Sequence, residues 1–434
     1  MFTATLSVRS LLFSLALAGL ALLPATASPA DPYTVNTQDD YLPFLPSDPK
    51  ISLRSALNSA NSNPGPDEII LPAGIYTLTI TGSGDDTNSA GDLDIRDSVT
   101  ITGAGPDKTI IDGNAIDRVF DILFSFKLEG ISVVLKNLTI QNGRVTPTVS
   151  LPGGAGIQNR ENLTLNNVVV RNNTAVGDNS NYVTGGGILN GGSLTMVQCT
   201  VSGNRARRGG GLFTGKATTI KQSLITENLA MFGSGILAGG DLLLENTTIH
   251  FNGFDGFDGG RCALAVSGPG TAVVNFCTIT DNLTFDILQS SGLCTMVDTV
   301  NTASLTLRGT ILAGNKRLGS ATPNNCFLEA ALTSASYNLE DANTCGFSPA
   351  TNLVDTDPKL GPLQDNGGPT QTRALAADSP AIDYVKINTG VTVDQRGFTR
   401  PVGPWADIGA YEYEPPPLCF PVKSPDGKSA IICL

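Results

Sequence analysis

The sequence predicts an all-β protein, a single-stranded right-handed parallel β-helix with a short helical cap at its N-terminal end and an irregular cap at its C-terminal end. Similar segments recur along the chain, each closing on Asn, and inside each segment apolar and polar residues alternate with period two. The composition agrees with this fold. The 434 residues include 48 glycines and only 15% charged residues, which suits strands and tight turns better than long helices.

Six segments align without gaps, at 163–173, 194–204, 218–228, 242–252, 272–282 and 305–315. They close on Asn173, Asn204, Asn228, Asn252, Asn282 and Asn315, at spacings of 31, 24, 24, 30 and 33 residues. Helical hairpin repeats need longer units with a 3.6-residue period, so we interpret the segments as coils whose strands bond to the next coil about 4.8 Å away. We expect a structural role for the asparagines, because Asn tolerates left-handed backbone at turns and stacked amides can bond from coil to coil.

The same alternation predicts the side chains of the interior. Apolar columns are expected from Leu194, Cys199, Val201, Ile225, Ile249 and Ile279. Glycine-rich corners at 154–157, 185–188, 209–212 and 233–236 permit positive φ and close backbone approach, whereas a phosphate-binding loop would need a following Lys-Ser/Thr and a helix. The longer intervals 176–184 and 253–261 are expected to be outward loops, where a binding site on the coils would lie.

Residues 1–27 are interpreted as a secretory signal peptide. Arg9 precedes an apolar run at 11–23, Pro24 breaks the run, and small residues allow cleavage near Ala27. The run is shorter than the roughly 20 residues of a membrane span. We therefore expect an exported protein, extracellular or on the cell surface, with no membrane span after cleavage. The net charge of −12 argues against nucleic acid as a partner.

Eight cysteines, an even number in a chain expected to be exported, make disulfides plausible. Cys326 with Cys345 and Cys419 with Cys433 are the favoured pairs, because each pair brackets a short loop-like stretch. The connectivity stays open at this point. None of the spacings is a zinc pattern, and His250 is the only histidine.

Both ends of the predicted solenoid resemble known domains. Residues 52–60 are expected to form an amphipathic helix, with Leu53, Ala56, Leu57 and Ala60 on one face. This helix and the residues that follow, to Tyr76, resemble the N-terminal motif of CSLREA-domain proteins, exported bacterial proteins with parallel β-helix repeats of the pectin-lyase-like type. The resemblance breaks at Ile51, where the family has Cys, and at Ser55, where it has an acidic residue.

Segments 365–370, 379–383, 394–397, 400–401 and 407–412 resemble the choice-of-anchor Q domain, which often closes such helices. The two resemblances imply an N-terminal cap over 28–92, a β-helix over 93–345 and a C-terminal cap over 346–414. Residues 415–434 then form a Pro-led tail, interpreted as a disulfide-closed hairpin or as a recognition tail for secretion. The resemblance implies architecture and surface export, and little biochemistry.

Candidate chemistry is sparse on the coils. The paired carboxylates and the Gly-His-Gly motif of polysaccharide hydrolases are missing, as are the clustered Asp of a lyase, so we assign no catalytic residue. One acidic group, with Asp85, Asp92 and Asp94 as favoured ligands, suits Ca²⁺, although Asp side chains also cap turns. Charged residues near the C-terminus are interpreted as buried ion pairs that hold the cap, with a catalytic cleft as the alternative: Asp394, Arg396, Arg400, Asp407 and Glu412.

These observations favour a secreted or cell-surface protein that binds glycan or matrix without catalysis, in the manner of an adhesin. The first alternative is a carbohydrate-active enzyme, a polysaccharide lyase or hydrolase. The second is a passive structural protein of the cell surface.

Overall fold

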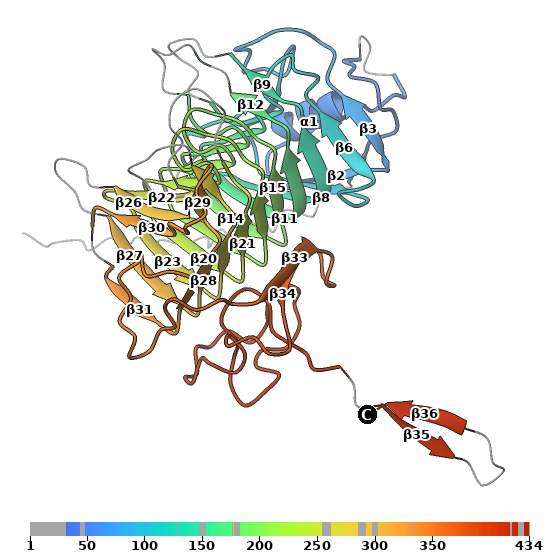
Figure 1. The fold of residues 1–434 in the computed structure, drawn as a ribbon. Coiled ribbons are helices and arrows are strands. Elements are labelled where there is room, and N and C mark those ends of the chain that lie inside the picture. Colours follow the sequence, from blue (N-terminus) through green and yellow to red (C-terminus); the bar gives the residue numbers. More distant parts are fainter. Residues whose placement is uncertain are drawn as a thin grey trace, which may run out of the picture.

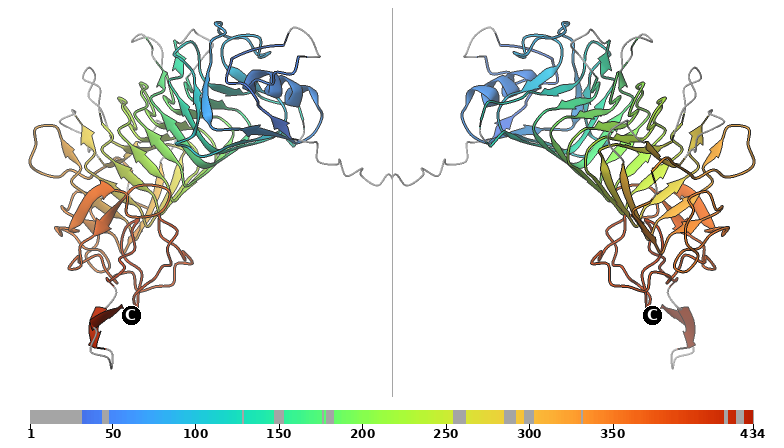
Figure 2. Two further views of the ribbon diagram at one scale, coloured as in Figure 1. Left: turned by 90° about the vertical axis from the view of Figure 1, so that its right-hand side faces the viewer. Right: turned by 90° about the vertical axis from the view of Figure 1, so that its left-hand side faces the viewer.

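The computed structural model describes residues 32–43, 48–127, 129–146, 153–175, 177, 183–253, 262–284, 292–296, 303–330, 332–416, 419–423 and 429–433. The expected signal peptide and the loop 254–261 lie outside the described residues, as does most of the loop 176–184. Within the described part, the chain forms the predicted right-handed parallel β-helix, with coils stacked from the single helix α1 (Leu53–Ser62) toward the C-terminal strands (Figures 1 and 2).

Three parallel ladders of strands form the walls of the solenoid. The first ladder contains, in spatial order, β4 (Leu93–Ile95), β7 (Phe120–Ile122), β10 (Ile157–Asn159), β13 (Ile188–Asn190), β16 (Leu212–Thr214), β19 (Ile236–Ala238), β22 (Leu264–Ser267), β26 (Leu293–Met296) and β30 (Cys326–Leu328). The second contains β1 (Tyr33–Thr34), β2 (Asp67–Leu71), β5 (Val99–Gly103), β8 (Ser132–Gln141), β11 (Asn162–Arg171), β14 (Ser193–Val197), β17 (Thr218–Lys221), β20 (Leu242–Glu245), β23 (Thr271–Asn275), β27 (Ser304–Arg308) and β31 (Ser334–Ser336).

The third ladder contains β3 (Gly74–Thr77), β6 (Thr109–Asp112), the second halves of β8 and β11, then β15 (Thr200–Ser202), β18 (Leu224–Thr226), β21 (Thr248–His250), β24 (Thr278–Thr280), β28 (Ile311–Ala313) and β32 (Leu339–Glu340). Shorter parallel pairs join β9 (Arg144–Val145) to β12 (Thr174–Ala175) and β25 (Leu283–Thr284) to β29 (Lys316–Arg317). Two antiparallel hairpins follow, β33 (Leu360–Gln364) with β34 (Thr372–Leu375) and β35 (Cys419–Lys423) with β36 (Ser429–Cys433). The first coil begins at β2, inside the range expected for the N-terminal cap.

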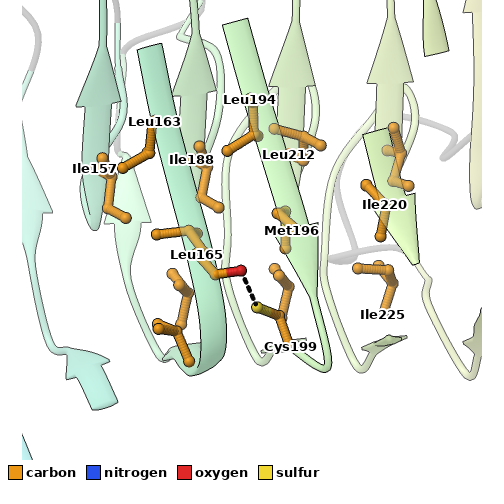
Figure 3. Close-up of a cluster of buried hydrophobic side chains, with 14 of the residues drawn as sticks. Ile157, Leu163, Leu165, Ile188, Leu194, Met196, Cys199, Leu212, Ile220 and Ile225 are labelled. Carbon is orange, nitrogen blue, oxygen red and sulfur yellow. Dashed lines mark hydrogen bonds between the residues drawn. The ribbon is translucent and has the colours of Figure 1, made fainter. Parts of the chain in front are cut away.

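The core runs through the middle of the coils. Alternation places every second side chain of a strand inward, and equivalent residues of successive coils then stack in columns, as Figure 3 shows for Leu163, Leu194 and their neighbours. The six side chains expected in apolar columns are all buried. The thiol of Cys199 fits this interior by pointing at the carbonyl oxygen of Leu165, 3.4 Å away.

The closing asparagines form one buried column along the solenoid. In each rung, the side-chain amide and the backbone N–H of one Asn donate to the Oδ1 of the next, as Asn204 does to Asn228 at 3.0 and 3.1 Å. The column continues past Asn315 to Asn325. The expected left-handed conformation does not fall on these asparagines. It falls on the residue before each, for example Gly203 at φ 62° and Glu227 at φ 57°, and the Asn that follows contributes its amide to the column.

The glycine corners make room for this column. A Cβ on Gly211 would lie 2.6 Å from the carbonyl oxygen of Gly235 and 3.1 Å from the amide of Asn228. Neither neighbour can move without breaking the bonds between coils, so the corner admits no side chain.

The helix α1 closes the N-terminal end. Ser52 caps it: its Oγ accepts from the N–H of Ser55, and the Oγ of Ser55 accepts from the N–H of Ser52. Ser55 therefore fills the capping position that is acidic in the family. The buried Arg54 finds its negative partner at Asp40 instead, with Nε 2.6 Å from Oδ1.

The C-terminal residues form two segments with different positions on the solenoid. Residues 341–356 close the solenoid, because Asn352 accepts from the N–H of Asn338 and the disulfide Cys326–Cys345 lies in the core beside Phe347. Residues 360–414, which carry most of the expected C-terminal cap, lie along the flank of the third ladder instead of over the open end (Figure 1). The outward face of that ladder is apolar around Phe276 and Ile311, and it therefore needs cover.

A second disulfide joins Cys262 to Cys294, and Cys199 and Cys277 are free and buried. In the C-terminal hairpin, the backbone places Cys419 opposite Cys433, but the side chains of these residues lie outside the described part of the structure. No helix among the described residues is both long and apolar enough to cross a membrane.

Candidate functional site

The outward column of the first ladder is polar only in the first three coils. In β4 and β7, three-residue strands of this ladder, the first and third side chains enter the core and the central one faces outward. The central residues of β4, β7 and β10 are Asp94, Asp121 and Gln158, which are partners in register. In the next coils the corresponding position is Leu189 and then Phe213. Charge is thus concentrated at the N-terminal end of this face.

Two arginines neutralise part of this charge. The buried Arg118 guanidinium places Nε 2.9 Å from Oδ2 of Asp92 and a terminal nitrogen 3.5 Å from Oδ2 of Asp121, and it also donates to Gln158. Arg160 lies 3.0 Å from the other oxygen of Asp121. Both arginines therefore contact Asp121, and neither forms an ion pair with Asp94.

The loop before β4 is fixed to the strand by Asn88. This residue has positive φ, and its N–H donates to Oδ2 of Asp94 at 3.0 Å. Its side-chain amide nitrogen donates to the carbonyl oxygen of Asp94, and its side-chain oxygen accepts from the N–H of Asp94. Asp94 is fully buried as a result, and no described residue donates to its Oδ1.

Burial also changes the acidity of this cluster. It raises the pKa of Asp92 to about 8, although the Arg118 guanidinium acts in the opposite direction. Burial raises the pKa of Asp94 to about 7, against the hydrogen bond from Asn88 and with the help of the nearby charge of Asp121. The pKa of Asp121 is raised as well, first by burial. Such a group of carboxylates has a strong tendency to take up protons or a cation.

An open cleft of about 950 Å³ lies directly beside the cluster. Its lining consists of Asp86, Thr87, Arg96, Leu123, Phe124, Ser125, Phe126, Lys127 and Arg160. Phe124 and Phe126 are 64% and 99% exposed, and their rings meet edge to face at 5.6 Å. Asp86 and Arg160 belong both to the cleft and to the charged cluster, so the two features form one site.

The segment that carries the two phenylalanines is held in place by Glu161. The carboxylate of this buried residue accepts from the N–H of Ser125 at 2.6 Å and from the N–H of Ile131 at 3.1 Å. The exposed rings are therefore presented from a fixed backbone, which lowers the entropy cost of binding a ligand.

The three residues expected to bind calcium have different partners in the structure. Asp85 closes a turn by accepting from Thr87, Ser89 and Ala90. Burial acts to raise its pKa, but the hydrogen bonds from Thr87 and Ser89 outweigh this and bring the pKa to about 2. Asp92 pairs with Arg118, and Asp94 alone of the three joins Asp86 and Asp121, with one oxygen of each within 4.8 Å of the others.

The charged residues near the C-terminus form a buried network. Arg400 pairs with Glu412 at 2.9 Å and lies 4.6 Å from the ring of Phe276. Arg396 pairs with Asp394 at 2.8 Å and stacks on Tyr411 at 3.8 Å. Asp407 accepts from the backbone of Asp383 and of Tyr413. The network faces the flank of the β-helix and is almost inaccessible to solvent.

His250 and the basic corner add no further candidate. His250 is half-buried at the end of β21, with Nδ1 3.7 Å from Oδ2 of Asp281, and burial lowers its pKa. Arg208 lies against the ring of Phe232 at 5.5 Å.

Sequence reasoning missed Asp121, Arg118, Arg160 and the two exposed phenylalanines. One signal was available. Leu93-Asp94-Ile95 and Phe120-Asp121-Ile122 repeat the same pattern, an Asp between two core residues, one coil apart. The ion pair between Arg118 and Asp92 depends on the conformation of the segment before β7, and no repeated sequence pattern predicts that conformation.

The fold makes this chain a right-handed parallel β-helix protein. No protein-family model matches the chain, and no curated protein matches it. Among solved structures, it is similar to the pectate lyase Pel9A, with a TM-score of 0.44 and 16% identity over 89% of this chain and 97% of that one. It is also similar to the A-module of the Azotobacter vinelandii mannuronan C-5 epimerase AlgE6, with a TM-score of 0.40 and 16% identity over 71% of this chain and 89% of that one. The resemblance to CSLREA and choice-of-anchor Q domains stays a prediction.

Proposed function

We propose that this protein is an exported glycan-binding protein that binds an acidic glycan, without cleaving it, in the cleft beside β4 and β7. The observation that carries the proposal is the pair of exposed phenylalanines set among cationic side chains in one cleft.

The rings supply the apolar part of the site. A side chain as large as Phe126 that is 99% exposed buries almost no apolar surface within the protein. Exposed apolar groups that gather in a hollow rimmed by polar residues mark interaction sites. A sugar ring has an apolar face of C–H groups and a polar rim, and thus suits such a hollow.

The cations supply the selectivity for acidic sugars. Arg96, Lys127 and Arg160 line the cleft of a protein whose net charge is −12. Lys127 pairs with Asp97 and Arg160 pairs with Asp121, so Arg96 is the cation of this lining that is left to bind an acidic group. Arg96 is exposed and forms no ion pair with any described residue, and its guanidinium suits bidentate binding of a carboxylate or sulfate.

A glycan array probed with the mature protein tests the proposal, with uronic-acid, sulfated and neutral glycans in separate groups. We expect signal for the acidic glycans, weakened by Arg96→Gln. No signal for any glycan contradicts the proposal. Release of reducing or unsaturated ends from a bound polysaccharide also contradicts it, because that result makes the protein an enzyme.

A further inference from the structure

The carboxylates at the edge of the cleft are arranged as cation ligands. Asp86, Asp94 and Asp121 each offer an oxygen, and these oxygens lie within 4.8 Å of one another. Calcium binds six to eight oxygens at about 2.3–2.6 Å in flexible geometry, so one ion can bridge carboxylate oxygens that lie this close. We infer that these three residues bind a calcium ion.

An independent observation at Asp94 points to a ligand. Asp94 is 0% exposed, and its Oδ2 accepts from the N–H of Asn88. Its Oδ1 is buried and receives no hydrogen bond from any described residue. A buried carboxylate oxygen without a partner is costly, and buried carboxylates are normally paired with donors or bound to metals. A cation at this oxygen removes the cost.

The local charge balance agrees. Asp92, Asp94, Asp117 and Asp121 are buried side by side, with Asp86 at the rim. Only the guanidinium groups of Arg118 and Arg160 form ion pairs with this group among the described residues. The five carboxylates therefore outnumber the two cations that pair with them, and a divalent ion supplies positive charge that the described residues do not.

The site is rigid on one side and open on the other. Asp94 and Asp121 project from the centres of paired strands, and Asn88 fixes the loop above them. Asp86 is exposed and lines the cleft, so the ion keeps coordination positions toward the cleft for water or for a carboxylate of the glycan. The second role rests on the proposed function, whereas the binding of calcium itself does not.

Calorimetric titration of the EDTA-treated mature protein with CaCl₂, without glycan, tests the site. We expect one ion per chain, with a Kd on the scale of about 10⁻⁴–10⁻³ M found for extracellular calcium modules. Asp94→Asn keeps the acceptor for Asn88 and removes the charge, and it should weaken binding about 10-fold or more. Asp86→Asn lies at the exposed rim, where it does not disturb folding, and should weaken binding too. Asp107→Asn, an exposed carboxylate on a loop, is the matched control and should bind calcium like the wild type.

Two results overturn the site: no binding by the wild type at about 10 mM calcium, well above the expected Kd range, or equal binding by Asp86→Asn and Asp107→Asn. The glycan array repeated in EDTA and in CaCl₂ separates the two claims. Calcium binding without any glycan signal refutes the proposed function and keeps the ion site. Glycan binding without calcium binding refutes the ion site and keeps the function.

Discussion

Asp94 and Asp121 are partners in register on the adjacent parallel strands β4 and β7. Like charges on directly neighbouring strand positions destabilise a sheet unless another group compensates them. Arg118 and Arg160 compensate Asp121, whereas no described residue forms an ion pair with Asp94. This asymmetry, beside a cleft with exposed phenylalanines, is what distinguishes the first coils from the rest of the solenoid.

Truncation of Phe126 should separate binding from stability. Because the ring is almost fully exposed, Phe126→Ala should leave the melting temperature unchanged while weakening acidic-glycan binding about 10-fold, or roughly 1.4 kcal/mol. Ile75→Ala, an exposed apolar residue on β3 outside the cleft lining, is the matched control. Equal glycan affinities of the two variants in a binding titration would show that the Phe126 ring does not contribute to glycan binding.

The asparagine column should be a main source of stability. Asn228 donates its amide to the carbonyl of Val201 and to Asn252, and its Oδ1 accepts from Asn204. Asn228→Ala leaves several buried polar groups without partners and should destabilise the protein by about 2–4 kcal/mol, at about 1–3 kcal/mol per orphaned group. Thermal melts compared with Asn343→Ala, an exposed position, check this. A loss no larger than that of the control would mean that the column is dispensable.

The buried ion pair on the flank should hold residues 360–414 against the β-helix. Arg400→Met leaves the carboxylate of Glu412 buried without its cation, a change that typically costs about 3–5 kcal/mol. Hydrogen exchange should then accelerate in residues 393–411 and remain slow in the coils near α1. The double variant Arg400→Met/Glu412→Gln should recover part of the protection. If residues 393–411 exchange at the same rate in the wild type, the single variant and the double variant, the Arg400–Glu412 pair does not anchor this segment.

Asp407 should make stability depend on pH. Burial, together with the charge of Glu412, raises the pKa of Asp407 from 3.8 to about 7. The folded state therefore holds a proton that the unfolded state releases between about pH 4 and pH 7, and this contribution to stability declines as pH rises through that window. Melting temperatures from pH 4 to 8 should fall less steeply for Asp407→Asn than for the wild type. Parallel curves would assign the dependence to other groups.

The fold was predictable because the repeated segments indicate both the coil length and the orientation of the side chains. The gapless segments ending in Asn fix the period, and the alternation fixes which side chains face inward. The helix, expected over 52–60 and found at Leu53–Ser62, was predictable from its apolar face. The cleft was much less visible. Phe124, Phe126 and Arg160 come together only because consecutive coils stack in register, and nothing local to each segment reports that contact.

The position of the C-terminal region was hidden for a similar reason. Its charged residues were interpreted as part of a cap, but the surface that they cover is formed around Phe276 and Ile311. These two residues lie more than 80 positions earlier in the sequence and follow the ordinary pattern of the coils. Long-range packing of this kind has no periodicity of its own.

The most direct test of the account is a binding titration of the mature protein with a uronic-acid oligosaccharide, oligogalacturonate, and with the same oligosaccharide after chemical reduction of its carboxyl groups. An acidic-glycan site at this cleft predicts saturable binding of the carboxylated form, weakened about 10-fold (roughly 1.4 kcal/mol) by Arg96→Gln but not by Lys108→Gln, and little binding of the reduced form. Equal binding of both forms, or an Arg96→Gln variant that binds like the wild type, would contradict it.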